Sequence, residues 1–245
     1  MGAYNLTINA TETIIPLKDI HFSKENKKAL QQLLKEFKHI EALSVYNLPV
    51  DNKLLLFGSS GCGKTTTAKA IAAALDKKII TIDLSSIVSS KLGETSQNIA
   101  SIFKKAAREK AILFIDEFDY IGRSRDHDNK DSEEMKRLVN TIIQLVDYFP
   151  TDAVLIAATN LTNTIDTALL RRFQVRLRFA LPNRIQLDSY YEAMLSKYPE
   201  KYNQMERIYG VSYAEAKDIL FKSVKQQIIA EEEEKALKPM ASTSN

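Results

Sequence analysis

The segment Gly58-Ser59-Ser60-Gly61-Cys62-Gly63-Lys64-Thr65 fits the pattern G-x-x-x-x-G-K-[ST] at every fixed position. Its glycines let the backbone curl so that N–H groups converge on phosphate oxygens, and a following helix points its positive end at the same place. An apolar run, residues 53–57, precedes the segment, and a stretch with helical spacing, roughly residues 63–76, follows it. This order of strand, loop and helix predicts a phosphate-binding loop rather than a chance glycine-rich turn.

The residue types in the loop suggest individual roles. Lys64 supplies positive charge to the β and γ phosphates and belongs with the catalytic residues, and the Thr65 hydroxyl ligates Mg²⁺. The residues expected to contact the nucleotide are Gly58, Ser59, Ser60, Gly61, Cys62, Gly63, Lys64, Thr65 and Thr66. Cys62 is interpreted as a small residue at a variable loop position, and the alternative is a redox-sensing thiol at a helix N-terminus.

Outward from the loop, apolar runs alternate with stretches of helical spacing. Strands are expected at 53–57, 78–82, 111–115, 153–158 and 175–179, and helices at 23–46, 63–76, 95–110 and 133–149. Because the strands are almost wholly apolar, helices should cover both faces of a parallel sheet. The sequence therefore predicts an α/β fold, a P-loop NTPase three-layer sandwich with a five-stranded parallel sheet, followed by a small all-helical lid domain.

The change from alternating elements to helix alone sets the expected domain boundaries. Residues 1–14 are polar and expected to be flexible, 15–182 form the large α/β domain, 183–235 form the helical lid, and 236–245 are expected to be disordered. The composition is 44% hydrophobic and 27% charged, with a net charge of +3, which is typical of a soluble protein and too small to indicate nucleic acid.

A second chemical element is Ile112-Leu-Phe-Ile-Asp116-Glu117, an apolar strand that ends in two carboxylates. Open α/β sheets bind ligands at the carboxyl ends of their strands. Asp116 is expected to hold Mg²⁺, and Glu117 to orient and deprotonate the attacking water. The alternative is that these carboxylates only begin a solvated loop. The presence of a phosphate loop in the same chain favours the magnesium and water-activating roles.

The phosphate loop, the segment ending in Asp116-Glu117, and Ala157-Ala-Thr-Asn160 together resemble the AAA+ ATPase family, over about residues 17–231. Within that family the chain is similar to the AAA branch of unfoldases and disassembly ATPases, and to bacterial stand-alone AAA ATPases. The resemblance implies ATP and Mg²⁺ as ligands. It also implies that Asn160 is a sensor that positions water near the γ-phosphate.

The segment Ala168-Leu-Leu-Arg171-Arg172-Phe173 resembles the one that carries the family's arginine fingers. Such an arginine stabilises charge in the site of the next subunit, which implies a head-to-tail homo-oligomer, a hexameric ring in this family. Many relatives have Pro-Gly within this segment and this chain does not, so the division of roles between Arg171 and Arg172 stays open.

Two weaker matches concern the adenosine. Ile20 lies at the family's adenine-side position, although His21 follows it where relatives often have Gly. Ser212-Tyr213-Ala214-Glu215 resembles the Ser-Gly-Ala-Asp start of a lid helix. Tyr213 replaces the glycine, so Ala214 is the better match for a nucleotide contact.

The segment Ser89-Ser-Lys91-Leu-Gly93-Glu-Thr95 matches the first pore loop of the family in position, with Lys91 in the place of an aromatic residue. A lysine cannot grip apolar side chains as an aromatic ring does. Three interpretations stay open: contact with an acidic segment of a dedicated protein partner, contact with nucleic-acid phosphate, and a solvated side chain.

The remaining sequence features concern the surroundings of the protein. The single cysteine allows no internal disulfide, so a reducing cytoplasmic location is expected. No apolar run reaches the roughly 18 residues that span a bilayer, so no membrane partner is expected. We therefore expect an oligomeric ATPase that remodels or regulates a dedicated protein. The alternatives are an ATP-dependent assembly switch for an effector and a DNA-associated AAA+ ATPase.

Overall fold

The structure, a computed structural model, describes residues 16–84, 92–123, 129–161 and 165–237, and its centre is a five-stranded parallel sheet. The strands are β1 (Lys53–Gly58), β2 (Ile79–Asp83), β3 (Ile112–Asp116), β4 (Val154–Thr159) and β5 (Val175–Phe179), in the order β2-β3-β4-β1-β5. All five lie within one residue of their predicted positions. The predicted α/β class with a five-stranded parallel sheet is confirmed.

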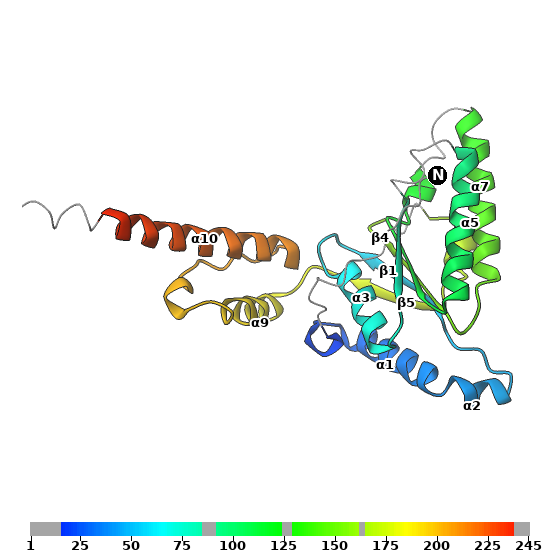
Figure 1. Ribbon diagram of the computed structural model, residues 1–245, viewed down its shortest axis with the longest axis horizontal. Coiled ribbons are helices and arrows are strands. Elements are labelled where there is room, and N and C mark those ends of the chain that lie inside the picture. The colour runs from blue at the N-terminus through cyan, green and yellow to red at the C-terminus, as the bar shows by residue number, and fades with distance from the viewer. Residues whose placement is uncertain (1–15, 85–91, 124–128, 162–164, 238–245) are drawn as a thin grey trace, which may run out of the picture. The chain divides into compact units, whose positions relative to one another are not determined.

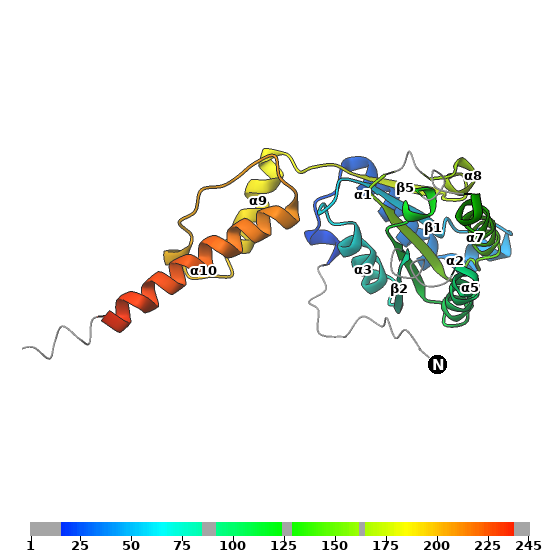
Figure 2. The same ribbon diagram turned by 90° about the horizontal axis from the view of Figure 1, so that it is seen from above.

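Helices cover both faces of this sheet. The α-helices before the last strand are α1 (Lys24–Lys38), α2 (Ile40–Val45), α3 (Lys64–Ala74), α5 (Leu92–Arg108), α6 (Tyr120–Arg123), α7 (Asn129–Asp147) and α8 (Thr167–Leu170), with a short 3-10 helix, η1 (Leu17–Asp19). Figures 1 and 2 both show α5 and α7 side by side on one face and α3 on the other.

The core follows from the alternation of side chains along each strand. Leu55, Leu113 and Leu155 belong to one buried cluster together with residues of α5 and α7. Within this cluster the rings of Phe103 and Phe149 meet edge to face, with centroids 5.7 Å apart. The central strands are buried on both faces, which holds their carboxyl ends in fixed positions.

The expected single helix over 23–46 is wrong, because the structure has two helices there. Ser23 caps α1, its side chain accepting a hydrogen bond from the Asn26 backbone N–H. The helix ends at Lys38 because His39 adopts φ −115° and ψ 23°, outside the helical range, and α2 then begins at Ile40. The apolar spacing continues through Phe37 and Ile40, which hides the break in the sequence.

Contacts divide the chain into two compact units. The sheet unit comprises 1–58 and 64–179, and the helical unit comprises 59–63 and 180–245. In the helical unit, α9 (Arg184–Leu195) packs on α10 (Tyr213–Leu237), with a 3-10 helix, η4 (Glu200–Tyr202), between them in sequence.

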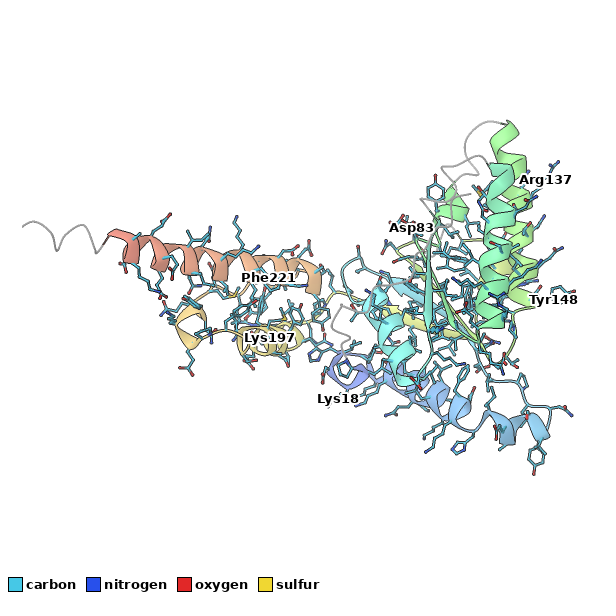
Figure 3. All side chains as sticks on the ribbon, viewed as in Figure 1. Lys18, Asp83, Arg137, Tyr148, Lys197 and Phe221 are labelled. Atoms are coloured by element: carbon cyan, nitrogen blue, oxygen red, sulfur yellow. The ribbon has the colours of Figure 1, made fainter. Side chains whose placement is uncertain are left out.

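The helical unit has its own buried cluster, made of Leu187, Tyr191, Leu195, Ala216, Leu220 and Val224, and Phe221 packs against it (Figure 3). Residues 203–212 are not helical, although the region 183–235 was expected to be helical, and α10 begins at Tyr213 and continues to Leu237, two residues past the predicted end of the lid. Among the described residues, no helix is both long and apolar enough to cross a membrane.

Candidate active site

The predicted phosphate loop links the end of β1 to the start of α3. Gly58 has φ +126°, and a Cβ at this position would lie 1.9 Å from the Phe179 backbone oxygen. Only glycine therefore lets β1 pass so close to β5 before the chain turns. Gly63 has φ +95° and no atom within 4 Å of its hypothetical Cβ, so the end of the loop borders open space.

Lys64 joins two predicted site residues. Its side chain is only 8% exposed, and Nζ donates hydrogen bonds to Asn160 Oδ1 at 2.8 Å and to the Gly58 carbonyl oxygen at 2.9 Å. Asn160 itself is exposed, directly after β4. The lysine that is expected to contact phosphate is thus held by the amide that is expected to sense it.

The predicted magnesium ligands also lie together. Thr65 Oγ1 donates a hydrogen bond to Asp116 Oδ2 at 3.1 Å, and the Glu117 N–H donates to Asp116 Oδ1 at 2.9 Å. A hydroxyl and a carboxylate are hard oxygen ligands, which Mg²⁺ prefers, so the residues present fit the expected ion. Asp83, which the sequence reasoning missed, pairs in register with Asp116 across β2 and β3 and is labelled in Figure 3.

Glu117 has a backbone conformation that is unusual for its residue type. Its φ is +49°, in the left-handed region, and its side chain is exposed. Such conformations are held only where the surroundings determine them, and they are frequent at functional sites. Here the next residue provides the anchor, because Phe118 is fully buried and its N–H donates to the Ala158 carbonyl oxygen at 2.8 Å.

Asp119 is a second residue that the sequence reasoning missed. It is 3% exposed, and Oδ1 accepts hydrogen bonds from Thr159 Oγ1 at 2.9 Å and from the Asn160 N–H at 3.2 Å. The sequence offered one signal, a third carboxylate in the run Asp-Glu-Phe-Asp. That signal does not distinguish a buried carboxylate from a solvated one.

The two predicted arginines differ sharply in their contacts. Arg172 makes two hydrogen bonds with Asp147, from Nε to Oδ1 at 2.7 Å and from Nη2 to Oδ2 at 2.9 Å, and a third from Nη1 to the Ala168 carbonyl oxygen at 2.6 Å. Hydrogen bonding to Asp147 raises the pKa of the Arg172 guanidinium. The Arg171 side chain is exposed and has no hydrogen bond or ion pair within the described part of the chain.

An aromatic contact connects the arginine segment to the acidic turn. Phe173, directly after the two arginines, meets Phe118 edge to face, with ring centroids 5.6 Å apart and an interplanar angle of 85°. Both rings are almost fully buried. The segment that carries Arg171 is therefore packed against the turn that carries Glu117.

The remaining loop residues, 59–63, belong to the helical unit. The Ala214 N–H donates to the Gly61 carbonyl oxygen at 3.1 Å, and a Cβ on Gly61 would lie 2.6 Å from Ser212 Oγ. Cys62 is buried, with Sγ 3.5 Å from the Ser60 carbonyl oxygen. Burial, with smaller contributions from Cys62 and Tyr190, raises the pKa of the Tyr213 phenol to about 12.

The other predicted positions are less informative. Ile20 directly follows the 3-10 helix η1, which packs on α3, and is partly exposed. Ser59 and Thr66 are also partly exposed, in the loop and in the first turn of α3. Lys91, residues 1–14 and the tail from residue 238 lie outside the described residues, so the expectations for them stay predictions.

A phosphate loop after β1, carboxylates at the end of β3 and an amide at the end of β4 define a P-loop nucleoside triphosphatase. Known proteins agree with this class. Residues 54–181 match the profile of the ATPase family associated with various cellular activities (AAA). The chain belongs to this family of ATPases, whose members hydrolyse ATP.

Individual relatives support the same family. The chain is 34% identical over 214 residues to the uncharacterised AAA family ATPase y4kL of Sinorhizobium fredii, covering 86% of this chain and 64% of that protein. It is 32% identical to the ATP-dependent zinc metalloprotease FtsH of Lancefieldella parvula, covering 72% of this chain and 28% of the protease.

Among solved structures, the crystal structure of the FIGL-1 AAA domain superposes with a TM-score of 0.62 at 26% identity, over 76% of this chain and 62% of that domain. The chain thus spans less than two thirds of the length of each of these relatives.

Proposed function

We propose that this chain hydrolyses Mg-ATP as a head-to-tail homo-oligomer, a hexameric ring in the cytoplasm, and uses the cycle to remodel or regulate a dedicated protein partner. Membership of the AAA family supports ATP as the substrate. The hydrogen bonds of Lys64 with Asn160 and of Thr65 with Asp116 support the assignment of these four residues to one nucleotide site.

Each residue of the site has a proposed role. Lys64 exchanges its hydrogen bond with Asn160 for the β and γ phosphates, and Asn160 then orients the attacking water. Glu117 accepts a proton from that water, with its side chain directed by the left-handed backbone conformation. Thr65 and Asp116 hold Mg²⁺, which when bound neutralises charge on the phosphates.

The observation that carries the oligomeric part of the proposal is the contrast between the two arginines. Arg172 is fixed to Asp147 of its own chain, whereas Arg171 is exposed and makes no side-chain hydrogen bond in the described residues. We therefore assign the role of arginine finger to Arg171, which is available to a neighbouring copy. Arg172 braces the segment from which Arg171 projects.

Mixing two inactive variants tests this assignment. Glu117→Gln lacks the proposed base but keeps Arg171, and Arg171→Ala lacks the arginine but keeps the base. Each alone should lose ATP turnover by at least about 10³-fold, which is the scale of an arginine finger. A 1:1 mixture should recover up to about one quarter of wild-type turnover, because in a randomly mixed ring that share of sites pairs an intact base with an intact arginine.

The matched control mixes Arg171→Ala with the double variant Glu117→Gln/Arg171→Ala, which offers no intact arginine and should stay inactive. Failure of the first mixture to recover, with both variants assembling normally, would show that Arg171 does not act on a neighbour. The loss of activity in Arg171→Ala would then be an effect on the site of its own chain.

A dedicated protein partner is proposed from the chemistry of the sequence. Lys91 stands at a position where threading relatives carry an aromatic residue, and a lysine suits an acidic segment better than diverse apolar side chains. Two alternative functions would replace the remodelling of a protein partner. One is an assembly switch for an effector, and the other is a DNA-associated ATPase.

A further inference from the structure

The structure places a buried carboxylate, Asp119, between the ends of β3 and β4. Residues Asp119 and Thr159 are 3% and 1% exposed, and Asn160 follows Thr159 directly. We propose that Asp119 and Thr159 are positioning residues that fix the location of Asn160 relative to Glu117. This inference rests on the proposed ATPase function, because it concerns residues of that same site.

The contacts form a small network around the Asn160 backbone. Thr159 Oγ1 donates to Asp119 Oδ1 at 2.9 Å and accepts the Leu161 N–H at 3.0 Å, and the Asn160 N–H donates to the same Asp119 oxygen at 3.2 Å. Two consecutive backbone N–H groups beyond the last residue of β4 are therefore held by side chains. These bonds fix the backbone on both sides of Asn160, and its side-chain amide accepts the hydrogen bond from Lys64 Nζ at 2.8 Å.

The network also fixes the distance between two turns. The Phe118 N–H donates to the Ala158 carbonyl oxygen at 2.8 Å, one residue before the contacts of Asp119 with Thr159 and Asn160. The turn after β3, which carries Glu117, is thus joined to the end of β4 by three hydrogen bonds. If Glu117 activates water that Asn160 orients, these bonds set the spacing of the two groups.

Because burying the Asp119 carboxylate costs free energy, we infer that this side chain has a role beyond packing. Removing a carboxylate from water costs several kcal/mol unless hydrogen bonds compensate. An apolar side chain would fill the same volume without this cost, but it could not accept hydrogen bonds from Thr159 and Asn160. A displacement of about 1 Å at a catalytic group can cost about 100-fold in rate, so a rigid support has a clear benefit.

Three single variants test the proposal in the full-length chain. Thr159→Val keeps the shape of the side chain but removes the hydroxyl, and kcat should fall about 10- to 100-fold while the Kd for ATP changes less than about threefold. Thr159→Ser restores the hydroxyl and should stay within about threefold of wild-type kcat.

Thr81→Val is the matched control, because the Thr81 hydroxyl on β2 is buried and has no hydrogen-bond partner among the described residues. Its kcat should be unchanged. A fall in kcat in Thr81→Val equal to that in Thr159→Val would show that any buried threonine change disturbs the site, and would overturn the proposal.

A double variant separates positioning from general damage. In an Asn160→Ala background, Thr159→Val should lower kcat by less than about twofold, since it acts through a side chain that is no longer present. An equal fall in both backgrounds would overturn the proposal.

Amide hydrogen exchange supplies a readout that does not depend on hydrolysis. In Thr159→Val, exchange at Asn160 and Leu161 should accelerate at least about tenfold while the central strands keep their protection. If wild-type protein failed to hydrolyse ATP, the proposed function would be wrong, and the exchange result would still decide whether Asp119 and Thr159 hold this turn. Unchanged exchange at both amides would overturn the positioning role.

Discussion

Gly58 shows how a single residue connects the fold to the site. Gly58→Ala would place a Cβ 1.9 Å from the Phe179 backbone oxygen, at a φ of +126° that alanine rarely adopts. Because the obstacle is backbone of a paired strand, relief requires β1 and β5 to separate. We expect a loss of about 3 kcal/mol or more in the free energy of unfolding, measured by urea denaturation.

The control for Gly58 is Gly210→Ala. Gly210 has φ +75° but no atom within 4 Å of its hypothetical Cβ, so it isolates the conformational cost. We expect a loss of about 1–2 kcal/mol there. If both variants lost the same free energy of unfolding, the contact between the added Cβ and the Phe179 backbone oxygen would not be destabilising. That result would contradict this prediction.

At the same scale, some candidate residues have a local signal in the sequence and others do not. The phosphate loop has a local pattern in which every fixed position is set by phosphate chemistry, and Asp116 follows directly from an apolar strand. Asp119 was missed because its partners, Thr159 and Asn160, are forty and forty-one residues away. The pairing of Arg172 with Asp147, which distinguishes the two arginines, likewise exists only once α7 and α8 are folded.

At the scale of the element, Glu231 on α10 is held by three neighbours. Its carboxylate accepts hydrogen bonds from Lys201 and from Tyr202, at 2.7 Å each, and forms an ion pair with Lys235 at 2.7 Å. These contacts, Lys201 first, lower the pKa of Glu231 to about 2. The lowered pKa means that the unfolded chain binds this proton more readily than the folded one. The stabilisation is therefore present above about pH 4.5 and is lost as the pH falls toward 2.

Glu231→Gln tests this effect against Glu233→Gln, which removes an equal charge from an exposed neighbour on the same helix. At pH 7 the Tm of Glu231→Gln should be roughly 2 °C below that of Glu233→Gln, a small shift because the pair is close to solvent. The difference should shrink as the pH is lowered from 5 to 3. A difference that stays constant over that range would show that the ion pair is not its source.

Strands were predicted better than helices, for a physical reason. A strand buried on both faces must be apolar along its whole length, so its ends are visible where polar residues return. The break at His39 and the non-helical stretch 203–212 depend on backbone angles and tertiary contacts that apolar spacing does not record. Element type therefore follows from composition, whereas interruptions do not.

At the scale of the whole molecule, the role proposed for the exposed Arg171 predicts that one chain alone hydrolyses ATP only at a basal rate. ATP turnover per chain should rise with protein concentration and level off where the measured mass reaches that of the assembled ring. Arg171→Ala should stay near the basal rate at every concentration and keep its affinity for ATP, because the phosphate loop of its own chain is intact. Steady-state ATPase and mass photometry on the same samples test both expectations.

The same experiment distinguishes the three functions that the sequence left open. Turnover that follows assembly supports a ring with shared sites, whereas assembly on ATP with negligible turnover would indicate a switch that holds an effector. Stimulation by DNA with a steep dependence on salt would indicate a nucleic-acid partner, since each phosphate contact releases counterions. A rate per chain that is independent of concentration and of Arg171 would place the complete site within one chain and would refute the shared-site proposal.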